Sequence, residues 1–303
     1  MTSSPLPVSA AGGPAVARPA ATVACHHTIS GVGLSDPARF SFAERVTAAR
    51  AAGLDGIGLT WQDYERLRSG GQDGPTLRAI ADDAGVRVVE VEFLNSWWAD
   101  GERGAQAVEQ ERLALEMADV FGARHLGVGA SVPAADAPPH EVLVERFAGL
   151  CDRAAEHGLR VGLEFMPFFV LSDARRAWRV VADAGHAAGG LTVDAFHVGR
   201  GATDLAMLAE IPPERIVAFQ LSDVVADPRW PVLTETLEHR QWPGDGVLDL
   251  AGLAAVVLRP GADVAVEVEV LNAEHRRAPV ADSNARAARG LRDVVAAAGQ
   301  RAV

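Results

Sequence analysis

The chain has 303 residues, a hydrophobic content of 49% and a formal net charge of -12 at pH 7. Its length suits one (β/α)8 domain, and its acidic balance excludes a nucleic-acid or acidic-membrane surface, because phosphate groups need a basic footprint. Its two cysteines, Cys25 and Cys151, give no disulfide framework and no zinc spacing, which favours a reducing, cytoplasmic compartment.

The N-terminal segment differs from the rest of the chain. Residues 1–20 are rich in Ala, Pro, Ser and Gly, and they lack the basic start and continuous apolar core of a signal peptide. We therefore expect a disordered tail at 1–20 and one folded domain at 21–303. No segment approaches the roughly 20 apolar residues of a membrane span, so no membrane partner is expected.

From Thr22 onward, strand-like runs alternate with helix-like segments. The predicted strands are 22–28, 56–60, 87–93, 125–129, 160–164, 191–194, 217–220 and 264–269. The predicted helices are 42–52, 75–84, 105–121, 140–157, 174–184, 204–208, 250–258 and 283–298. Glycines at 53, 85, 122, 158 and 185 each stand just before a strand, where glycine can take the left-handed conformation that ends a helix.

Eight alternating units favour a closed (β/α)8 TIM barrel over an open doubly wound sheet. A glycine-rich phosphate loop is missing from the strand-helix turns, which argues against a nucleotide-binding sheet. The long segment 224–249 is predicted to be an active-site lid, because unstructured segments of that length are usually functional.

Four predicted strands end in a side chain that can bind a metal ion. Glu164, Asp194, Gln220 and Glu269 end the fifth to eighth strands, so they should be neighbours around half of the barrel mouth. Three carboxylates would repel one another there without a cation. Oxygen donors suit Mg²⁺ or Mn²⁺, with Co²⁺ as a further candidate. Unrelated, solvated strand ends are the alternative interpretation.

Further polar residues point at the same mouth. His197 follows the sixth strand and is a candidate substrate contact or acid/base, and Arg240 could hold a carbonyl, carboxylate or phosphate oxygen. Glu267 should face inward one layer below Glu269, as a support for the metal site, a base, or a silent partner of an arginine. Asp223 could orient a ligand or pair with Arg200 or Arg240.

Other candidates rest on weaker signals. Glu92 lies near the end of the third strand, and Trp97 and Trp98 follow it. The Trp pair could form a wall for a ring-shaped substrate or simply pack a loop. His26 and His27 fall near the end of the first strand, and strand alternation would let one of them face the barrel interior.

Taken together, these motifs resemble the xylose isomerase-like (β/α)8 superfamily of sugar isomerases, epimerases and inosose-type dehydratases. The motifs are LEF at 163–165, VDAFHVGRG at 193–201, QLSD at 220–223, RQWPGDGVLDL at 240–250 and VEVEVLNAE at 266–274. The resemblance implies that Glu164, Asp194, Gln220 and Glu269 are the metal ligands. Many members carry histidine at the position of Gln220, whereas a glutamine is similar to the 3-dehydroshikimate dehydratase branch.

The resemblance implies a divalent-metal-dependent isomerase or epimerase that removes a proton next to the carbonyl of a sugar or keto-polyol through a metal-stabilised enediolate. Its catalytic residues would be Glu164, Glu269 and His197, and its substrate contacts His197 and Arg240. The weaker signals add Glu92 and Trp97 as candidate substrate contacts. A dehydratase of a cyclic keto-polyol, such as 3-dehydroshikimate or an inosose, is the alternative, and a non-catalytic barrel subunit is a third. A homo-oligomer is expected by resemblance alone, and DNA repair is rejected.

Overall fold

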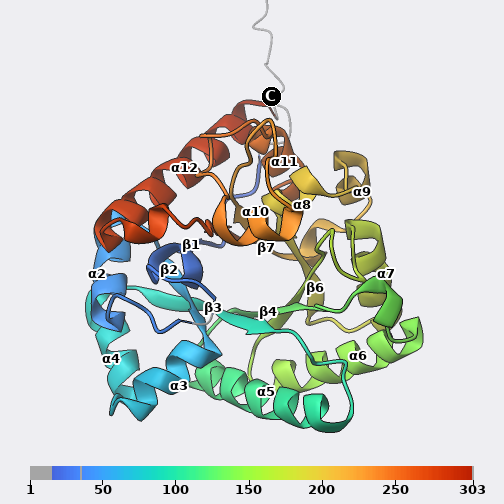
Figure 1. The fold of residues 1–303 in the computed structure, drawn as a ribbon, viewed down its shortest axis with the longest axis horizontal. Coiled ribbons are helices and arrows are strands. Elements are labelled where there is room, and N and C mark those ends of the chain that lie inside the picture. Colours follow the sequence, from blue (N-terminus) through green and yellow to red (C-terminus); the bar gives the residue numbers. More distant parts are fainter. Residues whose placement is uncertain (1–15, 35, 302–303) are drawn as a thin grey trace, which may run out of the picture.

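The fold is a closed barrel of parallel strands surrounded by helices (Figure 1). The computed structural model describes residues 16–34 and 36–301. Within these ranges each strand pairs with the next in sequence, and β1 pairs with β8 to close the barrel. The strands are β1 (Ala21–Ala24), β2 (Gly56–Thr60), β3 (Arg87–Leu94), β4 (His125–Gly129), β5 (Arg160–Glu164), β6 (Gly189–Asp194), β7 (Ile216–Leu221) and β8 (Ala265–Val268).

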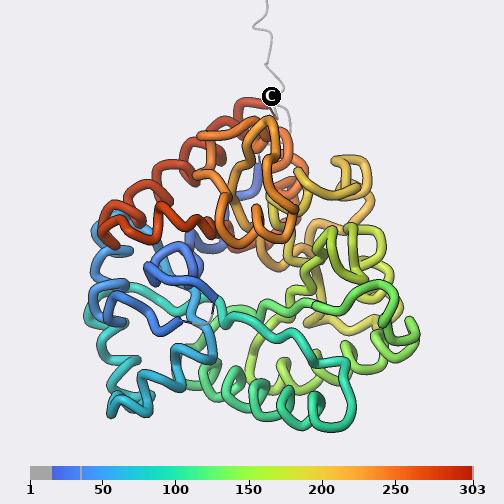
Figure 2. The backbone as a smooth tube through the Cα atoms, viewed as in Figure 1, coloured from blue at the N-terminus to red at the C-terminus, as the bar shows by residue number. Residues whose placement is uncertain are grey.

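The longer helices form the outer ring, whereas the short helices α1, α8 and α10 lie over the barrel (Figure 1). The chain passes once around the barrel, so that α12 packs beside α2 (Figure 2). This confirms the predicted (β/α)8 TIM barrel. The helices are α1 (His26–Ile29), α2 (Phe42–Ala52), α3 (Trp61–Ser69), α4 (Gly74–Ala84), α5 (Gly101–Phe121), α6 (His140–Glu156), α7 (Ala174–Ala184), α8 (Ala195–Arg200), α9 (Leu205–Ala209), α10 (Val232–Glu238), α11 (Leu250–Val257) and α12 (Val280–Arg301).

Local sequence signals explain where several helices begin and end. Ser41 and Glu44 form a reciprocal capping box at the start of α2, which satisfies backbone N–H groups that have no partner within the helix. Gly53 and Gly85 end α2 and α4 with φ angles of 79° and 66°. Only glycine takes this left-handed conformation without steric cost, so the predicted helix ends are confirmed at these two positions.

One predicted element was too long, and one helix was missed. The first strand ends at Ala24 rather than at residue 28, because the chain turns at Cys25 into the short helix α1, which holds His26 and His27. The helix α3 was not predicted. It begins directly after β2. Thr60 ends the strand, as predicted, and its side chain also accepts a hydrogen bond from Asp63 N and caps the helix.

The two segments predicted to lack regular structure have different outcomes. Residues 1–15 of the predicted tail lie outside the described residues, whereas Ala17 and Ala20 donate backbone hydrogen bonds to Leu258 and Val264. The predicted lid at 224–249 contains α10 and is therefore not unstructured. Within the described ranges, no helix combines the length and apolar character needed to cross a membrane.

Candidate active site

A cavity of about 230 Å³ opens at the carboxyl ends of the strands. Glu164 ends β5, Gln220 lies near the end of β7, and Glu269 follows β8. The side chains lining the cavity include Glu164, His197, Gln220, Arg240 and Glu269. In (β/α)8 barrels this end of the strands carries the active site, so the predicted strand-end residues lie where chemistry is expected.

Glu164, Asp194 and His197 form a tight buried group, with one ligand-capable atom of each within 4.8 Å of the others. His197 Nε2 lies 3.2 Å from Glu164 Oε1 and 3.4 Å from Asp194 Oδ2. The local fold explains the grouping. Asp194 caps α8 by accepting a hydrogen bond from Phe196 N at 2.8 Å, and the first turn of α8 then carries His197 back beside Asp194.

Arg240 connects this group to Glu269. Its Nη1 donates to Asp194 Oδ2 at 2.7 Å and to Glu269 Oε2 at 2.8 Å, while its Nε donates to the carbonyl oxygen of Thr236 at 2.9 Å. Burial disfavours the charged guanidinium, but Asp194 and Glu269 outweigh this effect and raise the Arg240 pKa. Arg240 is therefore a permanent cation in the wall of the cavity.

The residues present fit a divalent cation. Burial raises the pKa of Glu164 and, more strongly, that of Glu269, so holding these carboxylates ionised costs free energy that a cation would offset. Carboxylate oxygens and one imidazole nitrogen are acceptable ligands for Mn²⁺, Co²⁺ or Zn²⁺. In this structure His197 lies with Glu164 and Asp194 as a candidate metal ligand. From the sequence, His197 was predicted to contact substrate or to act as an acid or base.

Two predicted site residues, Gln220 and Trp97, are outside the group formed by Glu164, Asp194 and His197. The Gln220 amide nitrogen donates to Glu90 Oε1 at 3.2 Å, and its buried amide oxygen has no hydrogen-bond partner. Trp97 lies outside the set of residues that line the cavity. Its indole N–H donates to the Gly129 carbonyl oxygen at 2.9 Å and its ring packs on Phe147, so the loop-packing alternative describes it.

Glu92 lines the cavity, where it stays a candidate substrate contact. Its Oε1 accepts a hydrogen bond from His26 N at 2.7 Å, and burial and then Glu90 raise its pKa well above the ordinary value. The Glu92 carboxylate can lie here because residue 58 of β2 is glycine: a Cβ at Gly58 would lie 1.9 Å from Glu92 Oε1.

Asp223 pairs with neither arginine considered from the sequence. It accepts backbone hydrogen bonds from Val224, Gly244 and Leu248 at 2.9, 3.1 and 3.0 Å, and so holds the turn that follows Arg240. Arg200 pairs instead with the buried Glu235 of α10.

Sequence reasoning missed several residues near the site. Glu90 and His125 are buried beside Glu267, with His125 Nε2 3.2 Å from Glu267 Oε1 and 3.7 Å from Glu90 Oε1. Phe168 and Phe169 form an apolar wall of the cavity. The spacing of Glu90 and Glu92 on β3 matches that of Glu267 and Glu269, and could have indicated a second pair of inward carboxylates.

His27, also in the cavity wall, gives a pH prediction. Burial, then Arg276 and Arg240, lower its pKa from 6.5 to about 4. Between these two pH values the unfolded chain binds a proton that the folded chain does not, so the free energy of unfolding should fall as the pH drops through this window. Urea unfolding at several pH values should show a shallower pH dependence for His27→Gln, and equal slopes for both proteins would contradict the prediction.

Known proteins with similar sequences are dehydratases and isomerases by name. Residues 46–294 match the sequence profile of the xylose isomerase-like TIM barrel family. A 3-dehydroshikimate dehydratase of Pseudomonas aeruginosa is 28% identical over 257 residues, which are 83% of this chain and 39% of that protein. An inosose isomerase of Bacillus subtilis is 25% identical over 154 residues, which are 50% of this chain and 54% of that protein.

Two further comparisons concern the length of the relatives and the fold. The chain spans about two fifths of the length of the Pseudomonas dehydratase. The IOLI protein, solved with a binding zinc atom, aligns with a TM-score of 0.78 at 18% identity, covering 91% of this chain and 98% of that one, which supports the fold alone. Because the family profile matches most of the sequence, the chain belongs to the xylose isomerase-like TIM barrel family.

Proposed function

We propose that the chain is a divalent-metal-dependent enzyme that removes a proton next to a carbonyl group of a sugar-like keto-polyol. The observation that carries this proposal is the joint presence of Glu164, His197, Arg240 and Glu269 around one cavity at the carboxyl ends of the strands. Buried carboxylates with raised pKa values, a fixed cation and a histidine are the groups that proton abstraction beside a carbonyl requires.

Each residue has a role in this chemistry. A bound divalent cation would supply stabilisation of negative charge on the carbonyl oxygen. Glu164 or Glu269 accepts the proton, because a raised pKa brings a carboxylate closer to the basicity that is useful near neutral pH. Arg240 orients an oxygen of the substrate, and Phe168 and Phe169 limit the access of water from one side.

Within this chemistry we propose dehydration of a cyclic keto-polyol, with 3-dehydroshikimate as the first substrate to test. In the reaction a base takes the proton beside the carbonyl, the electrons of that C–H bond form a C=C bond, and the β-hydroxyl leaves as water with a proton from His197 or a protonated carboxyl. Two observations support this choice. The match to a named dehydratase covers 83% of the chain and 39% of that protein. Gln220 is the residue that the sequence resemblance to that branch implies.

An isomerase or epimerase is the second candidate. Glu164 and Glu269 approach the same cavity from β5 and from the end of β8, and two bases at one substrate are what proton exchange between neighbouring carbons needs. The match to a named inosose isomerase covers half of the chain. The two candidates differ in whether water is lost.

The test is proton NMR in D2O on the magnesium-loaded protein with 3-dehydroshikimate, inososes and ketohexoses, and with an EDTA-treated sample as the control. A vinylic or aromatic signal with loss of water supports the dehydratase. Deuterium incorporation beside the carbonyl with all hydroxyls retained supports the isomerase or epimerase. A folded, metal-loaded protein that exchanges no proton in any of these compounds would point to the non-catalytic subunit.

A further inference from the structure

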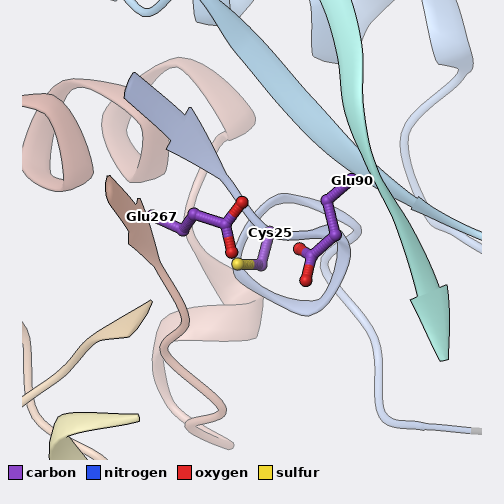
Figure 3. Close-up of side chains that lie close together, drawn as sticks. All are labelled: Cys25, Glu90 and Glu267. Carbon is purple, nitrogen blue, oxygen red and sulfur yellow. The ribbon is translucent and has the colours of Figure 1, made fainter. Parts of the chain in front are cut away.

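A second cluster of metal-capable side chains lies inside the barrel. It consists of Cys25, which follows β1, Glu90 of β3 and Glu267 of β8, and their side chains point toward one another (Figure 3). One ligand-capable atom of each lies within 4.8 Å of the others, and the three residues are at most 1% exposed. None of them belongs to the group of Glu164, Asp194 and His197.

The cluster has too few partners for the polar atoms it buries. Glu90 Oε2 and both Glu267 carboxylate oxygens have no hydrogen-bond partner. Among the ion pairs of the described residues, His125 is the one basic group within 4.0 Å of either carboxylate, and it approaches Glu267 without hydrogen-bond geometry. The partners present are the His125 imidazole beside Glu267 and one hydrogen bond from Gln220 to Glu90. Burying two carboxylates with so few partners is costly, because the ions lose their hydration.

We infer that Cys25, Glu90 and Glu267 bind a second divalent transition-metal ion, of the zinc or cobalt type. A thiolate with two carboxylates and a neighbouring imidazole is a donor set for borderline-soft ions, whereas Mg²⁺ and Ca²⁺ prefer oxygen ligands alone. The His125 ring, beside both carboxylates, is in position to complete the set or to hold Glu267 in place.

The second ion also affects the active-site cavity through Gln220. The Gln220 amide nitrogen lies 3.2 Å from Glu90 Oε1 and 4.0 Å from Cys25 Sγ, while the same side chain lines the cavity above. An ion that holds Glu90 and Cys25 fixes the amide nitrogen on the inner side and turns the unpartnered amide oxygen toward the cavity. The inner ion is therefore a positioning element for Gln220.

Protons are the competing way to neutralise the cluster. Burial raises the pKa of the Cys25 thiol well above its usual value, and burial together with Glu90 raises that of Glu267 to about 7. A metal ion must displace these protons, so its binding should become tighter as the pH rises. If protons neutralise the cluster, the protein binds no metal ion there, whereas the inference predicts one bound ion.

The experiment is a Co²⁺ titration of the metal-free, full-length protein, followed by absorption spectroscopy and metal analysis. We expect two equivalents of Co²⁺ and a thiolate-to-cobalt charge-transfer band in the near ultraviolet. Cys25→Ser should lose that band and one of the two equivalents, whereas Glu164→Gln should lose one equivalent and keep the band. Cys151→Ser is the matched control, because Cys151 is the other buried free cysteine and lies in α6, so its variant should keep both.

The inference is overturned if the folded wild-type protein binds a single equivalent without a thiolate band, and this outcome needs no variant. An infrared band of protonated carboxyls that persists in the Co²⁺-saturated protein and disappears in Glu267→Gln would likewise assign the cluster to protons. If wild type shows the thiolate band but has no activity, the inner ion is established and the proposed function is wrong. The two proposals can therefore fail independently.

Discussion

Replacing Glu164 by glutamine should remove the cation of the cavity and lower kcat/KM by about 10²–10⁴-fold. Glu164 ends β5 with Oε1 3.2 Å from His197 Nε2 in the group that also holds Asp194. Glutamine keeps the size of the side chain but removes its negative charge, which is the property that attracts a divalent ion. Mn²⁺ binding measured by calorimetry should weaken by more than about 10²-fold, because a direct ligand matters more than its outer supports.

Glu92→Gln is the matched control for this change. Glu92 is buried in the wall of the same cavity but lies outside the group of Glu164, Asp194 and His197, so its variant should keep the cation. Glu269→Gln should lose both cation and activity if the strand-end prediction of ligands is right. Wild-type Mn²⁺ affinity in Glu164→Gln would refute the assignment of Glu164 as a ligand.

The barrel itself could be predicted because its signals are local. Short apolar runs, helix-length spacers and glycines such as Gly53 and Gly85 specify strands, helices and helix ends without reference to distant residues. The first strand was predicted too long and α3 was missed, because an apolar run does not mark where the chain turns into a short helix. Cys25 N still donates to Val268 O of β8, and the chain turns into α1 at the next residue.

The gathering of residues at the active-site cavity could be predicted for a related reason. A parallel barrel brings every strand end to one mouth, so Glu164, Asp194 and Glu269 could be placed together without knowing any side-chain conformation. The inner cluster could not be placed in this way. Whether Glu90 and His125 meet Glu267 depends on the register between strands, and β3 carries register irregularities on both of its edges.

Arg240→Met should destabilise the metal-free protein by about 3–5 kcal/mol, the usual cost of removing one partner of a buried ion pair. The Arg240 guanidinium is 2% exposed and donates to both Asp194 and Glu269, so its loss leaves three acidic side chains, with Glu164, around one cavity without their nearest cation. A divalent ion restores the missing positive charge. Urea unfolding with EDTA and with Mn²⁺ should therefore show a larger metal-induced gain in stability for Arg240→Met than for wild type.

Arg200→Met is the control that shows how much stability is lost when a buried ion pair outside the cavity is broken. Arg200 also pairs with a buried carboxylate, Glu235, but that pair lies outside the cavity, so its loss should cost the same in EDTA and in Mn²⁺. If Arg240→Met lost equal stability in both conditions, Arg240 would be a structural partner of Asp194 and Glu269 with no thermodynamic link to the cation. If Arg240→Met gains more stability from metal than wild type and Arg200→Met does not, the guanidinium and the ion neutralise the same carboxylates. Arg240 then adjusts the charge of the site to which the substrate binds.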